Sequence, residues 1–296
     1  MSTSFGYLLK LPKFEHFEAK EILEACLLLS KYGERAKLIA GGTDLLVSMK
    51  KREVIPEYLI DIKGIRDLSY IQYQRGVLRI GAVTPLNDIE GFPIIQERFP
   101  ILASACHQIG TPQIRNLGTI GGNLCNASPS ADTAPALIGL GAKAKIMGLK
   151  GERTISLEEF FVGPGQSALQ DSEILTEIIV PELPGLSRGE YLKLPARTTI
   201  DIAVVGVAVI VTFDPKDNKI GDIKIVLGAV APTPVRAHKA EKIIIGKTVE
   251  GQLIEKAAQV AAEEARPISD IRGSAKYRRE MVKVLTQRAI KQVVRI

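Results

Sequence analysis

The sequence predicts an α+β protein built from at least two compact units. A helical pattern near the start leads into a short apolar strand that stops at a Gly-Gly pair, and strand-like runs follow between residues 54 and 83. Beyond a segment rich in Pro, Gly and Glu at residues 181–189, Val- and Ile-rich strands precede two helices. A chain of 296 residues is long for one hydrophobic core, which also favours several units.

The first predicted elements are a helix and a short strand. Helical spacing relates five small or apolar residues, Ala19, Ile22, Leu23, Cys26 and Leu27, and Gly33 supplies a stop. Residues 37–40 are then expected to form a buried strand that ends in a glycine turn. Cys26 is expected to be a core thiol on this helix.

Three strand-like runs come next, at residues 58–62, 68–71 and 77–80, and we expect a sheet of mixed strand direction. A helix is predicted at residues 101–108. Five Gly and Pro residues then crowd one segment, Gly110, Pro112, Gly118, Gly121 and Gly122. This crowding predicts a long irregular loop, and such loops inside a domain are usually functional.

The rest of the chain alternates between strand and helix patterns. Small and apolar residues at 131–142 predict a buried helix that leads into a strand near residues 144–146. Beyond the segment at 181–189 we expect strands at 203–213 and 220–230 and helices at 251–266 and 274–293. The basic residues between Lys276 and Arg295 alternate with apolar ones, which indicates the solvated face of the terminal helix.

Two glycine-bearing turns, at residues 40–45 and 118–123, are the main indication of a binding site in the sequence. Glycine lets backbone N–H groups approach an oxyanion without a Cβ in the way, and a following helix adds its dipole. Thr43, Thr119 and Asn123 add side-chain donors. The two turns together predict a diphosphate held from two sides.

Asp44 has a separate expected role. It precedes the apolar residues Leu45, Leu46 and Met49, so we expect it to be the N-cap of a short helix. Its carboxylate would then face backbone amides rather than a phosphate group.

Other motifs give weaker indications of function than the two glycine turns. Residues 139–144 satisfy G-x-G-x-x-A, but a helix pattern precedes them and a strand pattern follows, the reverse of a Rossmann site. A phosphate loop of the G-x-x-x-x-G-K-[ST] type is absent from the sequence. Cys106 and His107 are adjacent on a predicted helix, so their side chains should point about 100° apart and not act as a pair.

Composition narrows the class of protein. Three cysteines without a C-x-x-C motif and three histidines argue against a disulfide scaffold, a zinc site or an iron–sulfur cluster held by this chain. A net charge of +6 with 5% aromatic residues suits an anionic cofactor or acidic partner subunit rather than nucleic acid. Residues 1–7 do not read as a signal peptide and no apolar run is long enough to span a membrane, so a cytoplasmic location is expected.

Five segments together resemble one family. They are residues 38–45, the run from Gln113 to Asn123, residues 127–132, Tyr191 to Lys193 with Asp201 to Ala203, and Asp270 to Arg279. The first 170 or so residues resemble the FAD-binding domain of the vanillyl-alcohol-oxidase or PCMH type. The whole chain resembles the medium, flavin-carrying subunit of the molybdenum hydroxylases, which include carbon monoxide dehydrogenase, xanthine dehydrogenase and aldehyde oxidoreductases.

The resemblance implies a domain plan. A PCMH-type FAD-binding domain would occupy residues 1–180, in subdomains of about 1–60 and 61–180. A smaller α+β C-terminal domain of antiparallel sheet and helices would occupy residues 181–296.

The resemblance also implies a set of FAD-binding residues. The diphosphate would lie against two segments, Leu38, Ile39, Ala40, Gly41, Gly42, Thr43, Asp44 and Leu45 in the first, and Gly118, Thr119, Ile120, Gly121, Gly122 and Asn123 in the second. Ile109 and Thr111 would lie on the loop between them. Asp132 would accept a hydrogen bond from a sugar hydroxyl, and Leu175 would pack beside the adenine. Lys193 would lie near the flavin or its ribityl chain, and Asp201 and Ile202 would edge the flavin ring.

The resemblance implies electron transfer, with the chain acting as a subunit of an oxidoreductase. FAD would be noncovalent, since some relatives carry a histidine where this chain has Thr43 and no histidine lies in either turn. The molybdenum cofactor and [2Fe-2S] clusters would belong to a large and a small partner subunit, in a dimer of heterotrimers. The large subunit would oxidise an aldehyde, carbon monoxide or a purine, and FAD would pass electrons to an external acceptor.

Two alternatives remain open at this point. The chain could be a self-contained flavin oxidase, for which only Asp201 is a candidate base. It could also be an assembly or binding protein whose site no longer takes flavin. For Lys193 and Asp201, the alternative to a flavin site is an ion pair on the surface.

Overall fold

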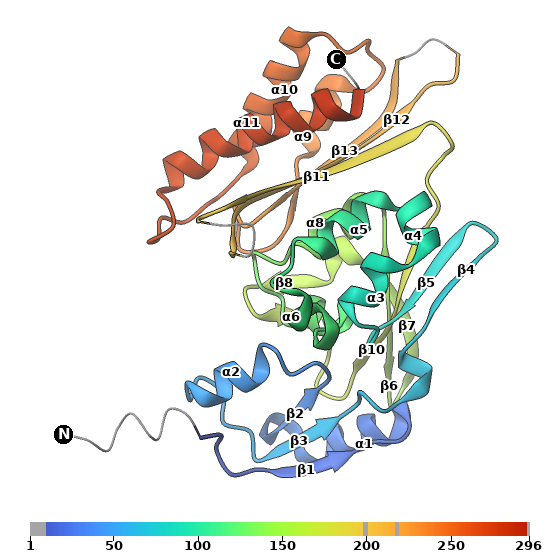
Figure 1. Cartoon of the computed structure of the whole chain (residues 1–296), viewed down its shortest axis with the longest axis vertical. Helices are drawn as coiled ribbons and strands as arrows, with labels where there is room; N and C mark the ends of the chain where they lie inside the picture. The colour runs from blue at the N-terminus through green and yellow to red at the C-terminus, as the bar shows by residue number, and fades with distance from the viewer. Residues whose placement is uncertain (1–9, 198–200, 217–218, 295–296) are drawn as a thin grey trace.

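The computed structural model describes residues 10–197, 201–216 and 219–294, so the N-terminal stretch at residues 1–7 lies outside the described part. The described chain forms three regions stacked along its long axis (Figure 1). None of the described helices is both long and apolar enough to cross a membrane.

The N-terminal region is a three-stranded parallel sheet in the order β1-β3-β2 with helices beside it (Figure 1). Its elements are β1 (Glu15–Glu18), α1 (Ile22–Tyr32), the 3₁₀ helix η1 (Gly33–Arg35), β2 (Ala36–Ile39), α2 (Leu45–Lys50) and β3 (Tyr58–Asp61). Cys26 is confirmed as a core thiol, but Leu23 and Leu27 are exposed. The helix buries Ala25 and Leu29 instead, because its apolar residues form two overlapping stripes that spacing alone does not rank.

The middle region contains a five-stranded antiparallel sheet in the order β4-β5-β10-β6-β7. The strands are β4 (Ile71–Gln74), β5 (Val77–Gly81), β6 (Lys143–Gly148), β7 (Gly151–Ser156) and β10 (Ile174–Pro181). The expected mixed sheet is therefore wrong, because β3 joins the parallel sheet whereas β4 and β5 join the antiparallel one. The strand predicted at residues 68–71 begins only at Ile71, since the 3₁₀ helix η2 (Arg66–Leu68) precedes it.

Short helices fill the space between this sheet and the C-terminal region (Figure 1). They are α3 (Leu86–Gly91), α4 (Pro93–Arg98), α5 (Pro100–His107), α6 (Pro112–Leu117), α7 (Ile120–Cys125) and α8 (Thr133–Gly139), followed by the 3₁₀ helix η3 (Leu157–Glu159) and the small hairpin of β8 (Phe161–Gly163) and β9 (Gln166–Ser167). The predicted irregular loop is wrong, because α6 and α7 occupy it. Thr111 and Thr119 start these helices by accepting hydrogen bonds from the amides of Ile114 and Gly122.

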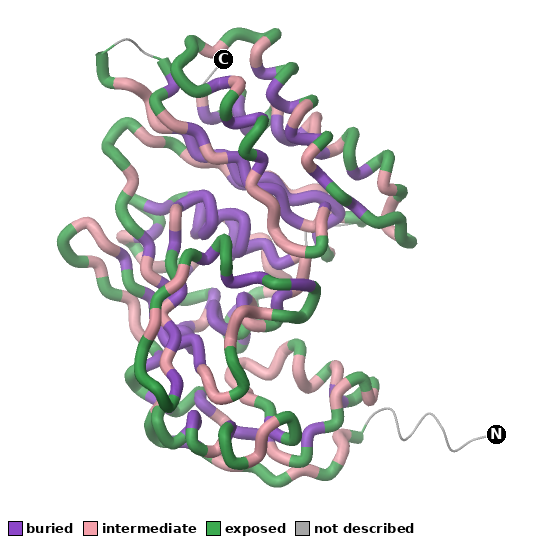
Figure 2. The backbone as a smooth tube through the Cα atoms, turned by 180° about the vertical axis from the view of Figure 1, so that it is seen from behind, coloured by how far each residue is buried: buried purple, intermediate pink, exposed green. Residues whose placement is uncertain are grey.

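The C-terminal region is a four-stranded antiparallel sheet with helices packed against it. Its elements are β11 (Ser187–Pro195), β12 (Ala203–Phe213), β13 (Ile220–Gly228), β14 (Val235–Arg236), α9 (His238–Ile244), α10 (Gly251–Glu264) and α11 (Ala275–Val294). Val207 and Val209 of β12 pack with these helices, whereas Ala208 and Ile210 join the core of the middle region. The strand is therefore apolar on both faces, and Figure 2 shows buried residues gathered where the two regions meet.

Two details of the C-terminal region differ from the sequence analysis. Helix α9 was not predicted, because Ala237 at its start cannot cap it and the Glu264 carboxylate of α10 accepts hydrogen bonds from the amides of Lys239 and Ala240 instead. Within the basic segment, Arg278 is buried rather than solvated and pairs with Asp270 at 2.7 Å.

Candidate functional site

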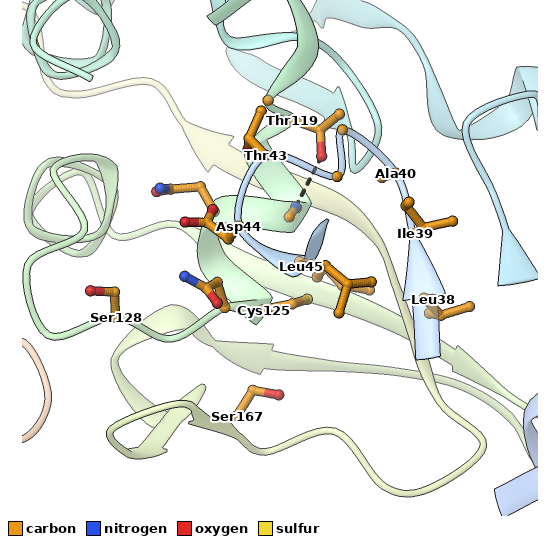
Figure 3. A pocket seen from close by; sticks show the side chains of 18 of the residues that line it. Leu38, Ile39, Ala40, Thr43, Asp44, Leu45, Thr119, Cys125, Ser128 and Ser167 are labelled. Carbon is orange, nitrogen blue, oxygen red and sulfur yellow. Dashed lines mark hydrogen bonds between the residues drawn. The ribbon is translucent and has the colours of Figure 1, made fainter. Parts of the chain in front are cut away.

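A cavity of about 910 Å³ opens where the three regions meet, and both glycine turns line it (Figure 3). All the site residues named from the sequence line this cavity except Thr111 and Ile120. Thr111 is occupied in capping α6, and Ile120 lies in the hydrophobic core. The volume is near the upper end of the range of about 300–1,000 Å³ that is usual for small-molecule sites.

The first turn joins the end of β2 to the start of α2. Gly42 has a φ of 70°, a left-handed conformation that favours glycine. None of the backbone amides of residues 41–45 donates a hydrogen bond to another described residue. These amides are therefore available to an anion in the cavity.

Asp44 does not behave as expected from the sequence. Its side chain makes no capping hydrogen bond, because its own backbone is already helical and a capping residue normally has an extended backbone. The carboxyl group lines the cavity, and the surrounding protein raises its pKa by desolvation. Asp44 stands at the N-cap position of α2, as predicted, but the expected hydrogen bond from its carboxylate to the backbone amides is wrong.

The second turn uses most of its amides within the protein. The amides of Ile120 and Gly121 donate to the carbonyl oxygens of Thr84 (3.1 Å) and Ala82 (2.8 Å). The Gly122 amide donates to the Thr119 hydroxyl at 3.1 Å, the dashed line in Figure 3. The two turns therefore do not present equal sets of free backbone amides to a diphosphate. The first turn has the free amides, and the second provides the surface against which it is held.

Glycine brings the two turns into contact. A Cβ added at Gly41 would lie 2.2 Å from the carbonyl oxygen of Leu117 and 2.9 Å from the Cα of Gly118. A Cβ added at Gly121 would lie 2.6 Å from the carbonyl oxygen of Ala82. These two glycines allow one backbone segment to pack directly on another, in addition to any role in binding a ligand.

A buried polar cluster forms another part of the wall. The Lys193 ammonium of β11 donates to the Asp132 carboxylate at 2.9 Å and to the carbonyl oxygen of Gln108 at 2.8 Å. The Tyr191 hydroxyl donates to the other Asp132 oxygen at 2.7 Å. Burial raises the pKa of Asp132, and the ion pair with Lys193 opposes that rise. Nothing in the sequence pattern marked Tyr191 as the partner of Asp132.

Lys193 and Asp201 do not form the surface ion pair that was the alternative. The Lys193 side chain is only 3% exposed, whereas Asp201 pairs with the exposed guanidinium of Arg197 at 3.1 Å. The backbone N–H of Ile202 and the Arg197 guanidinium lower the pKa of Asp201. A carboxylate held in its ionised form at neutral pH is a weak base.

Arg115 is a site residue that sequence reasoning did not single out. Its side chain is buried, and one nitrogen donates to the carbonyl oxygens of Ile109 (3.2 Å) and Gly110 (3.4 Å), both of which line the cavity. Its Nε lies 2.7 Å from the carboxylate of Glu90. The sequence signal that could have marked it is a lone arginine between the glycines at 110 and 118, whereas its burial is seen only in the structure.

Cys106 and His107 point apart, as expected. Cys106 is buried in the core, where desolvation raises the pKa of its thiol, and His107 is exposed and contacts Glu90 at 2.7 Å. They do not form a thiol–imidazole pair.

Comparison with known proteins connects this chain to a family. Residues 12–183 match the FAD binding domain in molybdopterin dehydrogenase, and residues 190–293 match the CO dehydrogenase flavoprotein C-terminal domain. The chain is 36% identical to the glyceraldehyde dehydrogenase medium chain of Sulfolobus acidocaldarius, covering 95% of this chain and 99% of that protein. It is 37% identical to the carbon monoxide dehydrogenase medium chain of Hydrogenophaga pseudoflava, covering 94% and 96%. A structure of the latter enzyme aligns with a TM-score of 0.93 over 96% of this chain and 98% of that one, at 37% identity.

Proposed function

Because the chain belongs to the family of FAD-binding medium chains of molybdenum-containing hydroxylases, we propose that it carries noncovalent FAD and transfers electrons within a heteromeric complex. The observation that carries this proposal is that the first glycine turn, Asp132 and Lys193 all line the same cavity. Its size suits an extended cofactor, and its free amides suit a diphosphate.

Each part of the wall has a role in this proposal. The amides of residues 41–45 bind the diphosphate, with the hydroxyl of Thr43 beside them. Asp132 accepts a hydrogen bond from a sugar hydroxyl, Lys193 lies near the flavin or its ribityl chain, and Leu175 packs beside the adenine. Asp201 and Ile202 border the flavin ring, and Ile109 lies on the loop between the two turns. When bound, FAD accepts electrons singly or in pairs, and the protein's contribution is to orient the ring and set the charge around it.

Partner subunits complete the proposal. The three cysteines of this chain are too few for the four thiolates that an iron–sulfur cluster usually needs. We therefore assign the [2Fe-2S] clusters to a small subunit and the molybdenum cofactor to a large one, as a dimer of heterotrimers. The large subunit oxidises an aldehyde, carbon monoxide or a purine-like substrate, and FAD delivers the electrons to an external acceptor.

Purification from the native source tests the assembly. We expect two companion chains at equal stoichiometry, one containing molybdenum and one containing iron and sulfide. Isolation of this chain alone, fully active on an aldehyde or purine, would overturn the assembly.

Reconstitution tests the cofactor separately. The isolated chain should bind FAD with flavin absorption bands, and acid precipitation should release all the flavin into the supernatant. Flavin that stays with the precipitate would contradict noncovalent binding, and failure to bind any FAD would contradict the cofactor itself.

The self-contained oxidase gains no support from the site. It needs a base beside the ring, and the pKa of the candidate Asp201 is lowered by the Ile202 N–H and by its ion pair with Arg197.

A further inference from the structure

The Asp132–Lys193 ion pair is unusual in this cavity because both side chains are buried. The exposed fractions of the Lys193 and Asp132 side chains are 3% and 8%, and their charged atoms lie 2.9 Å apart. The two residues come from different regions, Asp132 from the residue before α8 and Lys193 from β11. The pair therefore exists only in the folded chain.

The other charges on the wall are more accessible to water or have partners outside it. Lys37 and Glu34 are exposed, and Glu173 and Asp201 pair with Arg153 and Arg197. Among the described residues that line the cavity, Lys193 is the only cation with a buried side chain. A charge in this position acts through a medium of lower dielectric than water, so its effect on a bound ligand is large.

The pair as a whole is close to neutral, and this neutrality has a consequence. Removing the lysine charge would leave a buried carboxylate facing the cavity, and removing the aspartate charge would leave a buried ammonium. The two single changes should therefore have opposite effects on any ligand that gains negative charge.

We propose that the Asp132–Lys193 pair sets the relative affinity of this chain for oxidised and reduced FAD, and with it the reduction potential of the flavin. The inference rests on the proposed function. Reduction adds two electrons to FAD, and when only one proton is taken up the cofactor gains one negative charge. In the complex the electrons come from the iron–sulfur subunit, and in the assay they come from dithionite.

The test compares single and double variants of the full chain reconstituted with FAD. The potential is measured anaerobically against a reference dye at pH 7, together with the dissociation constant of oxidised FAD. Lys193→Met should lower the affinity for reduced relative to oxidised FAD by about tenfold, which corresponds to about 30 mV for a two-electron couple. Asp132→Asn should shift the same ratio by about tenfold in the opposite direction. The double variant should return to within about threefold of the original ratio.

Two further variants keep the test decisive. Tyr191→Phe keeps both charges but removes a donor from Asp132, so it should shift the ratio in the same direction as Lys193→Met. It replaces Lys193→Met if that variant does not fold. Glu177→Gln is the matched control, because Glu177 is a buried carboxylate paired with Arg79 away from the cavity wall.

The outcomes separate the two proposals. Opposite shifts in the single variants, with Glu177→Gln unchanged, support the inference. Shifts in the same direction, or no shift although FAD binds, overturn it and leave the proposed function standing. If the unaltered chain binds no FAD in either redox state, the proposed function itself fails.

Discussion

Gly41→Ala is expected to weaken FAD binding by forcing the two turns apart. The added Cβ would lie 2.2 Å from the carbonyl oxygen of Leu117, 2.8 Å from its carbonyl carbon and 2.9 Å from the Cα of Gly118. All three contacts are with backbone, so no side-chain rotation can relieve them. Ordinary van der Waals contact would require the turns to separate by about 1 Å.

The size of the effect follows from the strain. Overpacking of this kind costs about 1–3 kcal/mol. If the first turn moves to relieve it, the amides of residues 41–45 leave their positions. A loss of that size corresponds to about 5- to 150-fold weaker FAD binding.

Equilibrium dialysis or quenching of flavin fluorescence measures this change, and circular dichroism reports whether the variant folds. Gly64→Ala is the matched control, because no atom lies within 4 Å of a Cβ added there and its φ is ordinary. Its affinity for FAD should stay within about twofold of the original, since surface changes away from special features cost little. A Gly41→Ala chain that binds FAD as tightly as Gly64→Ala and melts at the same temperature would refute this reasoning.

Three other predictions concern positions around the site. Arg115→Met removes the bonds that hold two carbonyls of the cavity wall, so FAD binding should weaken about tenfold, and unchanged titrations would show that these bonds do not position the wall. Burial raises the pKa of the Cys125 thiol to about 12, so little thiolate forms below that pH. Disulfide-exchange labelling of the folded chain at pH 8 should therefore be slow, and slower still with FAD because Cys125 lines the cavity. Rapid labelling of the FAD-loaded chain would contradict both the raised pKa and the protection by FAD. Glu264→Ala removes the carboxylate that caps α9 and should cost about 1 kcal/mol in urea unfolding, whereas equal stability of this variant and Glu263→Ala would argue against a capping role.

Much of the fold could be predicted from the sequence where the determinants are local. The apolar run of β12 and the glycine stop of α1 involve neighbouring residues, and both glycine turns were identified as parts of one site. The caps of α6 and α7 are also local, but the crowded glycines and prolines led to a predicted loop instead. Strand partners were not predictable. The Tyr58 strand and the Val77 strand have similar patterns but join different sheets, because strand direction is decided by which distant segment they pair with.

The site shows the same division. The sequence by itself determined that residues 40–45 form a turn between a strand and a helix, since the glycines and the apolar residues after them are local features. The structure was needed to show that the Asp44 side chain leaves the amides of residues 41–45 uncapped. Only the tertiary structure decided that Gly41 packs on Leu117 and that Asp132 meets Lys193. It also decided that amides of the second turn donate hydrogen bonds to carbonyl oxygens just after β5, such as that of Ala82. Those contacts join segments separated by many residues, and the burial that gives an ion pair its strength exists only after the regions have packed together.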